Sequence, residues 1–332
     1  MQRTQVPPVT AQPGSCSAQT AKNNSGSSSV DWNSERLRRC LPRVITPPVL
    51  GLQHQVNAQH PFNSRAVSQT EYSQPPYNSV GKLAFTGVNW QTCQGILDYA
   101  GTAWLIAPRV IMTVAHNLFE VKCKDRSSNV EFFPGFDGQP QESYRVIDFE
   151  YVKAYEGNPP SVPADPSAVN DVGIGILDRD ASSALGKIPP LTNGVVDFDK
   201  VMAIGYPGNH DLGAKMWRCE GRVVPELSKP DQFVMPSDFQ GGSSGGPWVV
   251  ETPQGWRAVG AQVGNPYGVA GNYCVSGVFG QQVKTLLDWA NSRVDSGVEP
   301  DTTPSDTQPS ENDMRLRLKR IKNRLDEAIQ LT

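Results

Sequence analysis

Short apolar runs, separated by turns rich in Gly and Pro, fill the middle of the chain. Runs of this length with turn residues between them are typical of an all-β protein. Residues Val283, Leu286, Leu287 and Ala290 follow helical spacing, which predicts a closing amphipathic helix over residues 281–294. The predicted strands are Leu105-Ile106, Val110 to Val114, Phe149 to Val152, Val172 to Leu177, Val201 to Gly205, Cys219 to Val224, Phe233 to Met235, Trp248 to Val250, Ala258 to Val263 and Tyr273 to Phe279.

The N-terminal part of the chain lacks this pattern. Residues 1–34 are rich in Ser, Asn, Gln and Pro, and residues 44–78 carry few strand signals. We therefore expect residues 1–74 to be a disordered leader or a propeptide-like extension. The basic island from Glu35 to Arg43 is either a processing site or a solvated charged segment.

The C-terminal end combines a linker with a second helical pattern. Residues 296–313 are acidic and rich in Pro, Thr and Ser, as expected of a linker. In residues 314–332, apolar positions recur every three to four residues among six basic ones, which predicts a basic amphipathic helix. Such a helix can pair with itself, bind an acidic partner or lie on an anionic membrane. The alternative is a marginal helix with a solvated charged face.

Composition narrows the class of protein without identifying it. A chain of 332 residues is long enough for one catalytic unit with tails. The net charge of −3 gives no general attraction to nucleic acid, and no apolar run approaches the ~18 residues of a membrane span. The first thirty residues lack the apolar core of a secretory signal. Either a signal was removed, or export uses another route, or the protein stays inside the cell.

Three separate segments carry candidate chemistry. Ser244 lies in a glycine-rich turn that leads into an apolar strand, His116 ends a strand-like run, and Asp171 precedes another apolar strand. Alone, the first reads as a linker or turn, the second as an ordinary core or surface histidine, and the third as a turn residue. Together, in the order His, Asp, Ser, they predict a nucleophilic serine with its base and orienting carboxylate.

The chemistry explains why these residue types occur together. A serine hydroxyl is a weak nucleophile, so a neutral imidazole must take its proton during attack on a carbonyl. A buried carboxylate fixes the tautomer of that imidazole and stabilises its cation. Gly242 lacks a Cβ and can adopt positive φ, so we expect the N–H groups of Gly242 and Ser244 to form an oxyanion hole.

At this point the chain resembles the trypsin-like serine peptidases, and among them the V8-like branch that includes the glutamyl endopeptidases. The motifs around Ser244 and His116 are specific, and the likeness covers about residues 75–290. The similar segments are Pro75 to Leu83, Gly101 to Pro108, Thr113 to Asn117, Asp171 to Leu177, Gly205 to Gly208 and Gly242 to Pro247.

The resemblance implies a fold and an activity. The fold is all-β, with two antiparallel six-stranded Greek-key β-barrels, a closing C-terminal helix and flexible tails. The implied domain spans residues 75–295, with the first barrel at about 80–185 and the second at about 190–280. The active site would lie between the barrels and hydrolyse peptide bonds of protein or peptide substrates without a cofactor or metal. The resemblance also favours a secreted protein.

Several residues depart from the family pattern. The family commonly has a cysteine after the histidine, paired to one in the preceding strand, where this chain has Asn117 and the stretch Tyr99 to Gly101. The residue before the nucleophile is Ser243, not the aspartate that binds a newly cut N-terminus in trypsin-like zymogens. Activation by that ion pair is therefore not expected.

The six cysteines allow more than one arrangement. Within the implied barrels, Cys93 and Cys123 form one candidate disulfide, and Cys219 and Cys274 form a second. Six reduced thiols in a reducing compartment are an equally good interpretation.

The resemblance also places candidates for substrate recognition. The primary pocket would be walled by the residues before Ser244 and by the later strand from Ala258 to Asn265. Asp238, six positions before the nucleophile, matches the offset at which trypsin has the aspartate that selects Arg or Lys. Acid-specific relatives use a histidine on the later strand, where this chain has Gln262. The sequence leaves the residue preference open and assigns no role to His210.

The sequence thus predicts a serine endopeptidase that acts through an acyl-enzyme. Ser244 is the expected nucleophile, His116 the general base and Asp171 the orienting carboxylate. Two alternatives remain: a catalytically silent binding module with the same fold, or an esterase that uses the same triad.

Overall fold

The computed structural model describes residues 31–43, 63–157, 169–192, 198–226, 229–264 and 273–296. Most of the predicted acidic linker and the whole predicted basic helix at 314–332 lie outside these ranges. Within the described ranges, no helix has the length and apolar character that a membrane span requires.

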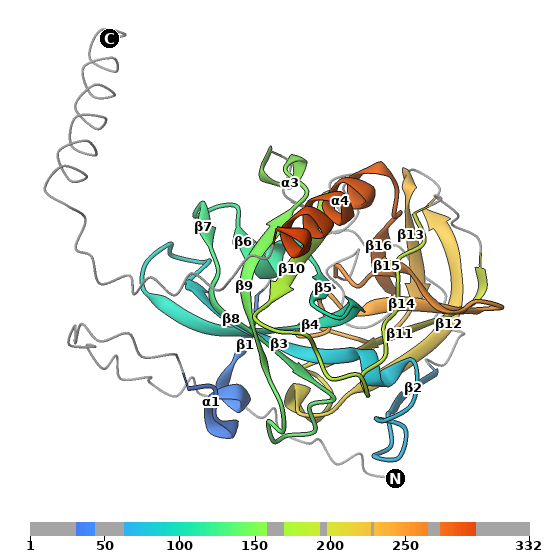
Figure 1. Cartoon of the computed structure of the whole chain (residues 1–332), viewed down its shortest axis with the longest axis horizontal. Helices are drawn as coiled ribbons and strands as arrows, with labels where there is room; N and C mark the ends of the chain where they lie inside the picture. Colours follow the sequence, from blue (N-terminus) through green and yellow to red (C-terminus); the bar gives the residue numbers. More distant parts are fainter. Residues whose placement is uncertain are drawn as a thin grey trace, which may run out of the picture. The chain divides into compact units, whose positions relative to one another are not determined.

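Strands hold far more of the described residues than helices do, as the apolar pattern predicts (Figure 1). The helices and 3-10 turns are α1 (Ser34–Arg39), η1 (Tyr77–Ser79), α2 (Ala115–Leu118), α3 (Ala154–Gly157), η3 (Asp211–Gly213) and α4 (Gln281–Asp295). The first ten strands are β1 (Leu41–Pro42), β2 (Asn63–Ala66), β3 (Val80–Val88), β4 (Ile96–Ala107), β5 (Val110–Thr113), β6 (Phe119–Glu120), β7 (Asp125–Arg126), β8 (Ser128–Pro134), β9 (Tyr144–Tyr151) and β10 (Gly173–Leu177). The later strands are β11 (Phe198–Gly205), β12 (Trp217–Glu226), β13 (Lys229–Pro236), β14 (Pro247–Thr252), β15 (Gly255–Ala261) and β16 (Tyr273–Gly277).

The first barrel is closed. Its strands follow the order β4-β3-β8-β9-β10-β5, and a further pairing of β4 with β5 joins the two ends. Side chains alternate along β3, since Leu83 and Phe85 pack inside this barrel whereas Ala84 packs in the cluster shared with the second barrel. This alternation is the reason that one strand serves both cores.

The second barrel contains six strands in the order β15-β14-β11-β12-β13-β16. Its outer strands approach each other at a bridge between Gly264 and Val275. The connection between the barrels pairs with the second one, because Leu191 N–H donates to Ala258 O at 2.8 Å. The predicted fold of two antiparallel β-barrels is therefore confirmed.

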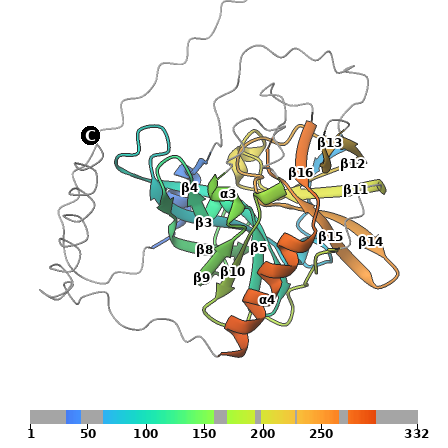
Figure 2. The same cartoon turned by 90° about the horizontal axis from the view of Figure 1, so that it is seen from above.

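Helix α4 closes the fold against the first barrel, next to β9 and β10 (Figure 2). Val283, Leu286 and Ala290 are buried, which is the apolar face that the sequence predicts. Arg293 forms an ion pair with Asp148 of β9 at 3.1 Å. The helix at the end of the second barrel thus covers the wall of the first.

Two parts of the predicted N-terminal extension differ from the expectation, because they pack onto the barrels. In residues 31–43, Trp32 and Leu37 are buried, and β1 pairs in parallel with Tyr99 and Ala100 of β4. In the second part, β2 pairs with β12. Strands of two and four residues carry too little periodicity to be seen in the sequence, since their partners lie far along the chain.

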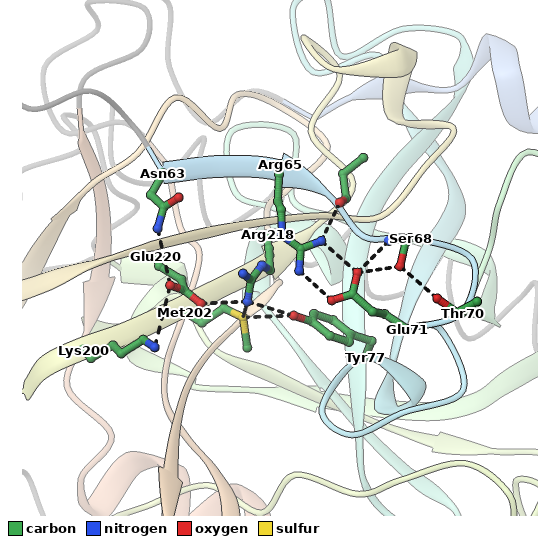
Figure 3. A network of polar contacts seen from close by, with 11 residues as sticks. Asn63, Arg65, Ser68, Thr70, Glu71, Tyr77, Lys200, Met202, Arg218 and Glu220 are labelled. Atoms are coloured by element: carbon green, nitrogen blue, oxygen red, sulfur yellow. Dashed lines mark hydrogen bonds and ion pairs between the residues drawn. The ribbon is translucent and has the colours of Figure 1, made fainter.

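A network of polar contacts fastens β2 and the turn that follows it (Figure 3). The Arg65 guanidinium binds the Glu71 carboxylate, and this ion pair holds the pKa of Glu71 well below its usual range. Arg218 of β12 binds both Tyr77 OH at 3.1 Å and Glu220 Oε1 at 2.7 Å. Residues that the sequence assigns to a leader therefore form part of the second barrel's wall.

The cysteines follow the sequence prediction only in part. Cys93 and Cys123 form a disulfide with their Cα atoms 5.3 Å apart. The second candidate pair is wrong in this structure, because Cys219 and Cys274 are buried thiols that form no disulfide with each other. Strand β13 runs between β12 and β16, and alternate strands lie about 9–10 Å apart, which is beyond the reach of a disulfide.

Candidate active site

His116 lies in α2, directly after β5, and is 2% exposed. Its Nδ1 is 2.7 Å from Asp171 Oδ2, and its backbone N–H donates to Asp171 Oδ1 at 2.9 Å. Both carboxylate oxygens therefore bind the same residue, one through the ring and one through the main chain. This pair of contacts fixes the orientation of the imidazole and directs its Nε2 away from Asp171.

The pairing of β10 with β5 explains why Asp171 lies beside His116. Gly173 pairs with Thr113 in antiparallel register, so the residues before Gly173 lie beside those after Thr113. A Cβ on Gly173 would lie 2.5 Å from Leu118 Cδ1, so any larger residue there would have to displace the Leu118 side chain. Asp171 is fully buried, and burial raises the pKa of the neighbouring Tyr155 well above its ordinary value, with the charge of Asp171 adding to this effect.

Ser244 lies between β13 and β14 of the second barrel, in a loop that depends on glycine conformations. Gly242 has φ +96°, and a Cβ there would lie 2.6 Å from Tyr206 O. Gly245 has φ +86°, and a Cβ there would lie 2.2 Å from Thr102 O. Neither position tolerates a side chain without movement of the backbone around the serine.

Two hydrogen bonds orient the expected oxyanion-hole donors. Gly208 N–H donates to Gly241 O at 2.7 Å, and Gly246 N–H donates to Ser243 O at 2.9 Å. In a trans peptide the C=O and the following N–H point in opposite directions. The N–H groups of Gly242 and Ser244 are therefore directed away from these bonds, and neither donates to a group in the described residues. Both remain available for an anion.

The first barrel holds the nucleophile loop through a backbone amide and two side chains. Ser244 O accepts from Thr102 N–H at 2.8 Å and from Asn117 Nδ2 at 3.0 Å. Thr102 Oγ1 also donates to Gly242 O at 2.9 Å. The sequence predictions missed these roles for Thr102 and Asn117. The departure at Asn117 was the available signal, because a buried amide in place of the family's cysteine needs hydrogen-bond partners.

The contacts of Asn117 place Ser244 near His116. Asn117 is adjacent to His116 in the chain and binds the Ser244 carbonyl. His116 Nε2 is buried and has no hydrogen-bond partner in the described residues, and Ser244 is 9% exposed. Asn117 thus joins the segment of the predicted base to the loop of the predicted nucleophile, and no hydrogen bond joins the His116 ring to Ser244 in the described residues. Such bonds are often absent before substrate binds.

The other predicted site residues lie close to this loop. Ser243 Oγ donates to Gln240 O at 2.7 Å and does not approach a charged group. Asp238 binds His210 and Ser64, whereas Gln262 is buried and accepts from Trp248 Nε1 at 2.9 Å. No hydrogen bond joins Asp238 to Gln262. Across the described ranges, no three His, Cys, Asp or Glu side chains gather as a metal site would require.

No protein-family model matches the sequence, and no curated protein matches it. Several solved structures match the fold. A thermostable serine protease, AL20, from an extremophilic microorganism has a TM-score of 0.53 at 19% identity, over 65% of this chain and 98% of that chain. The protease Anisep from Arthrobacter nicotinovorans has a TM-score of 0.55 at 16% identity, over 69% of this chain and 99% of that chain. A Glu endopeptidase in complex with MPD has a TM-score of 0.54 at 18% identity, over 69% of this chain and 97% of that chain.

At these identities the likeness concerns the fold. All three solved structures are proteases, and each is covered almost completely by part of this chain. The two barrels and the order of the site motifs agree with this likeness. The chain therefore has the two-barrel fold of the trypsin-like serine peptidases, as its sequence motifs predict.

Proposed function

We propose that this protein is a serine endopeptidase with Ser244 as nucleophile, His116 as general base and then acid, and Asp171 as the orienting carboxylate. The observation that carries the proposal is the combination of a fixed base and an anion site. Asp171 binds His116 through two bonds of 2.7 and 2.9 Å, and this leaves Nε2 unpaired. The unpaired amides of Gly242 and Ser244 belong to the loop that Asn117 and Thr102 hold beside it.

The proposed reaction follows from these positions. Ser244 Oγ attacks the scissile carbonyl carbon while His116 Nε2 takes the hydroxyl proton. The carbonyl oxygen becomes an oxyanion, which the N–H groups of Gly242 and Ser244 bind. Collapse breaks the C–N bond, and His116 returns the proton to the leaving amine. A water molecule then hydrolyses the acyl-enzyme by the same sequence of proton transfers.

Covalent labelling with a fluorophosphonate tests this assignment. Wild-type protein should be labelled at one serine, and Ser244→Ala should lose the label while it keeps its melting temperature. Ser243→Ala is the matched control, because this neighbouring hydroxyl binds Gln240 O instead of facing the base. Labelling that persists in Ser244→Ala, or that disappears in Ser243→Ala alone, would contradict the assignment.

Digestion of a diverse peptide library separates the proposal from the two alternatives. Cleavage by wild type and not by Ser244→Ala supports the endopeptidase. Turnover of esters without any peptide cleavage would favour the esterase. A chain that neither labels nor cleaves, although it is folded, would favour the silent binding module.

A further inference from the structure

Asp238 is the sole charged residue in the segments expected to surround the substrate side chain. Residues 237–247 contain this one aspartate, and the sequence from Ala258 to Val278 contains no Asp, Glu, Lys, Arg or His. Any charge selection by these segments must therefore come from Asp238. A free carboxylate there would favour Lys or Arg, so the partners of Asp238 decide the outcome.

Both oxygens of the Asp238 carboxylate already have partners. His210 Nε2 is 2.9 Å from Oδ2, and Ser64 Oγ donates to Oδ1 at 2.5 Å. The side chains of His210 and Asp238 are 20% and 23% exposed, so the pair is mostly shielded from water. A basic substrate side chain would have to displace these contacts before it reached the carboxylate.

Aromatic packing fixes the His210 ring in this position. The ring stacks on Trp217 with centroids 4.0 Å apart and meets the edge of Phe239 at 6.4 Å. Trp217 in turn donates from Nε1 to Asp211 Oδ2 at 2.9 Å. A ring held on one face by a tryptophan does not swing freely away from Asp238.

The backbone around His210 is joined to the segment that carries Asp238. Asn209 Nδ2 donates to Asp238 O at 2.9 Å, and Gln240 N–H donates to Asn209 Oδ1 at 3.1 Å. The bond from Gly208 N–H to Gly241 O, which orients the Gly242 amide, belongs to the same junction. His210 is therefore placed against Asp238 by the loop that also shapes the expected oxyanion hole.

We infer that His210 is a specificity-determining residue. Together with Ser64 it occupies the Asp238 carboxylate, so the peptidase cleaves after uncharged side chains and does not select Lys or Arg. This inference rests on the proposed peptidase function.

The test compares cleavage of a diverse peptide library by the full chain and by His210→Ala. Wild type should cleave after uncharged residues. His210→Ala should raise the ratio of kcat/KM for Arg over an uncharged residue at least tenfold, because the carboxylate gains a free oxygen. His210→Ala combined with Asp238→Asn should lose this gain. His210→Gln, whose amide can still donate to Asp238, should restore the wild-type preference.

Each result separates this inference from the proposed function. A wild-type enzyme that already prefers Lys or Arg, or a His210→Ala variant with an unchanged profile, would overturn the inference and leave the peptidase standing. If His210→Ala does not fold, a comparison of wild type with Asp238→Asn still tests the inference. The two proteins should have the same cleavage profile and should bind benzamidine, an arylamidine mimic of Arg, equally weakly. Absence of both labelling and cleavage in folded wild type would overturn both.

Discussion

The two halves of the candidate site are built in different ways. The base half, His116 and Asp171, lies entirely within the first barrel and is joined by direct bonds between the two residues. The nucleophile half, from Gly242 to Ser244, belongs to the second barrel, but its carbonyl groups accept hydrogen bonds from Thr102 and Asn117 of the first. One half is therefore internally fixed, and the other depends on a partner barrel.

This difference predicts where substitutions act. Changes that disturb the interface between the barrels should move the nucleophile and the anion site without altering the His116–Asp171 pair. Small displacements are costly in catalysis, because donors must lie at the position where the oxyanion forms. Substitutions in the nucleophile half and its supports should therefore show the largest losses of activity.

Gly242→Ala should have the largest effect on activity. An alanine Cβ would lie 2.6 Å from Tyr206 O at a φ of +96°, so the backbone must move and take the Gly242 N–H with it. Loss of one oxyanion donor costs about 10²–10³ in kcat. Steady-state kinetics on the best library peptide measures this loss.

Gly255→Ala is the control for backbone strain. Gly255 has a similar φ of +93°, but a Cβ there meets nothing within 4 Å. This variant should lose about 1 kcal/mol of stability with unchanged kcat. If both glycine variants lost activity to the same extent, strain alone would explain the result and the oxyanion role of Gly242 would be refuted.

Asn117→Ala should have an intermediate effect. It removes the 3.0 Å bond to Ser244 O and leaves Thr102 N–H as the remaining donor to that carbonyl. We expect kcat to fall about tenfold with little change in KM, together with a stability loss of about 1 kcal/mol. The variant also loses the 2.9 Å bond from Asn117 Nδ2 to Thr113 Oγ1. Asn78→Ala is the control, because Asn78 is a buried amide whose Nδ2 donates to Ala184 O and not to the nucleophile loop. Equal loss of kcat in both variants would show that Asn117 acts through stability alone.

Lys82→Met should change stability more than catalysis. Lys82 Nζ reaches across the barrels to donate to Gly213 O at 3.0 Å, and burial lowers the pKa of Lys82 to about 8. In the unfolded chain a lysine titrates near 10.4, so the unfolded state binds the proton more tightly between these values. Lys82 should therefore make the free energy of unfolding rise with pH from about 8 to 10.4, by at most about 3 kcal/mol.

Chemical denaturation at several pH values measures this rise. It should be missing in Lys82→Met and present in Lys122→Met, where an exposed lysine that donates to Gln91 O is removed. A rise of the same size in Lys82→Met would show that another group causes it. We expect kcat to change no more than a few-fold in Lys82→Met. The loop that contains Gly208 and Asn209 keeps its hydrogen bonds to Gly241 O and Asp238 O in this variant.

Local apolar patterns predicted an all-β protein and ten of the strands, but not β3 or β8 of the first barrel. The arrangement as two barrels followed from the resemblance of the motifs to a known family. His116, Asp171 and Ser244 were recognisable because each lies in a short motif beside a strand. The triad roles themselves remain predictions until labelling tests them. Helix α4 was also predictable, because its buried apolar residues recur at helical spacing within one segment.

Contacts between distant segments were not predictable in this way. The contact between His210 Nε2 and Asp238 Oδ2 joins two loops, and neither loop carries a periodic pattern. The pairing of β1 with β4 could not be predicted from the sequence either, because a strand of two residues is too short to show an alternation of apolar and polar positions. Cys219 and Cys274 were paired by their shared barrel, but the strand between them depends on sheet order, which local sequence does not reveal.

One edge of β4 illustrates how much of the surface the N-terminal segment protects. Along that edge β5 pairs near Trp104, Ser244 O accepts from Thr102 N–H, and β1 covers Tyr99 and Ala100. An uncovered strand edge is a template for the addition of another chain. A protein that begins after Arg43 would present this edge beside its nucleophile, where a second molecule can add as a strand. Aggregation, rather than loss of chemistry, is then the first defect expected of such a truncated chain.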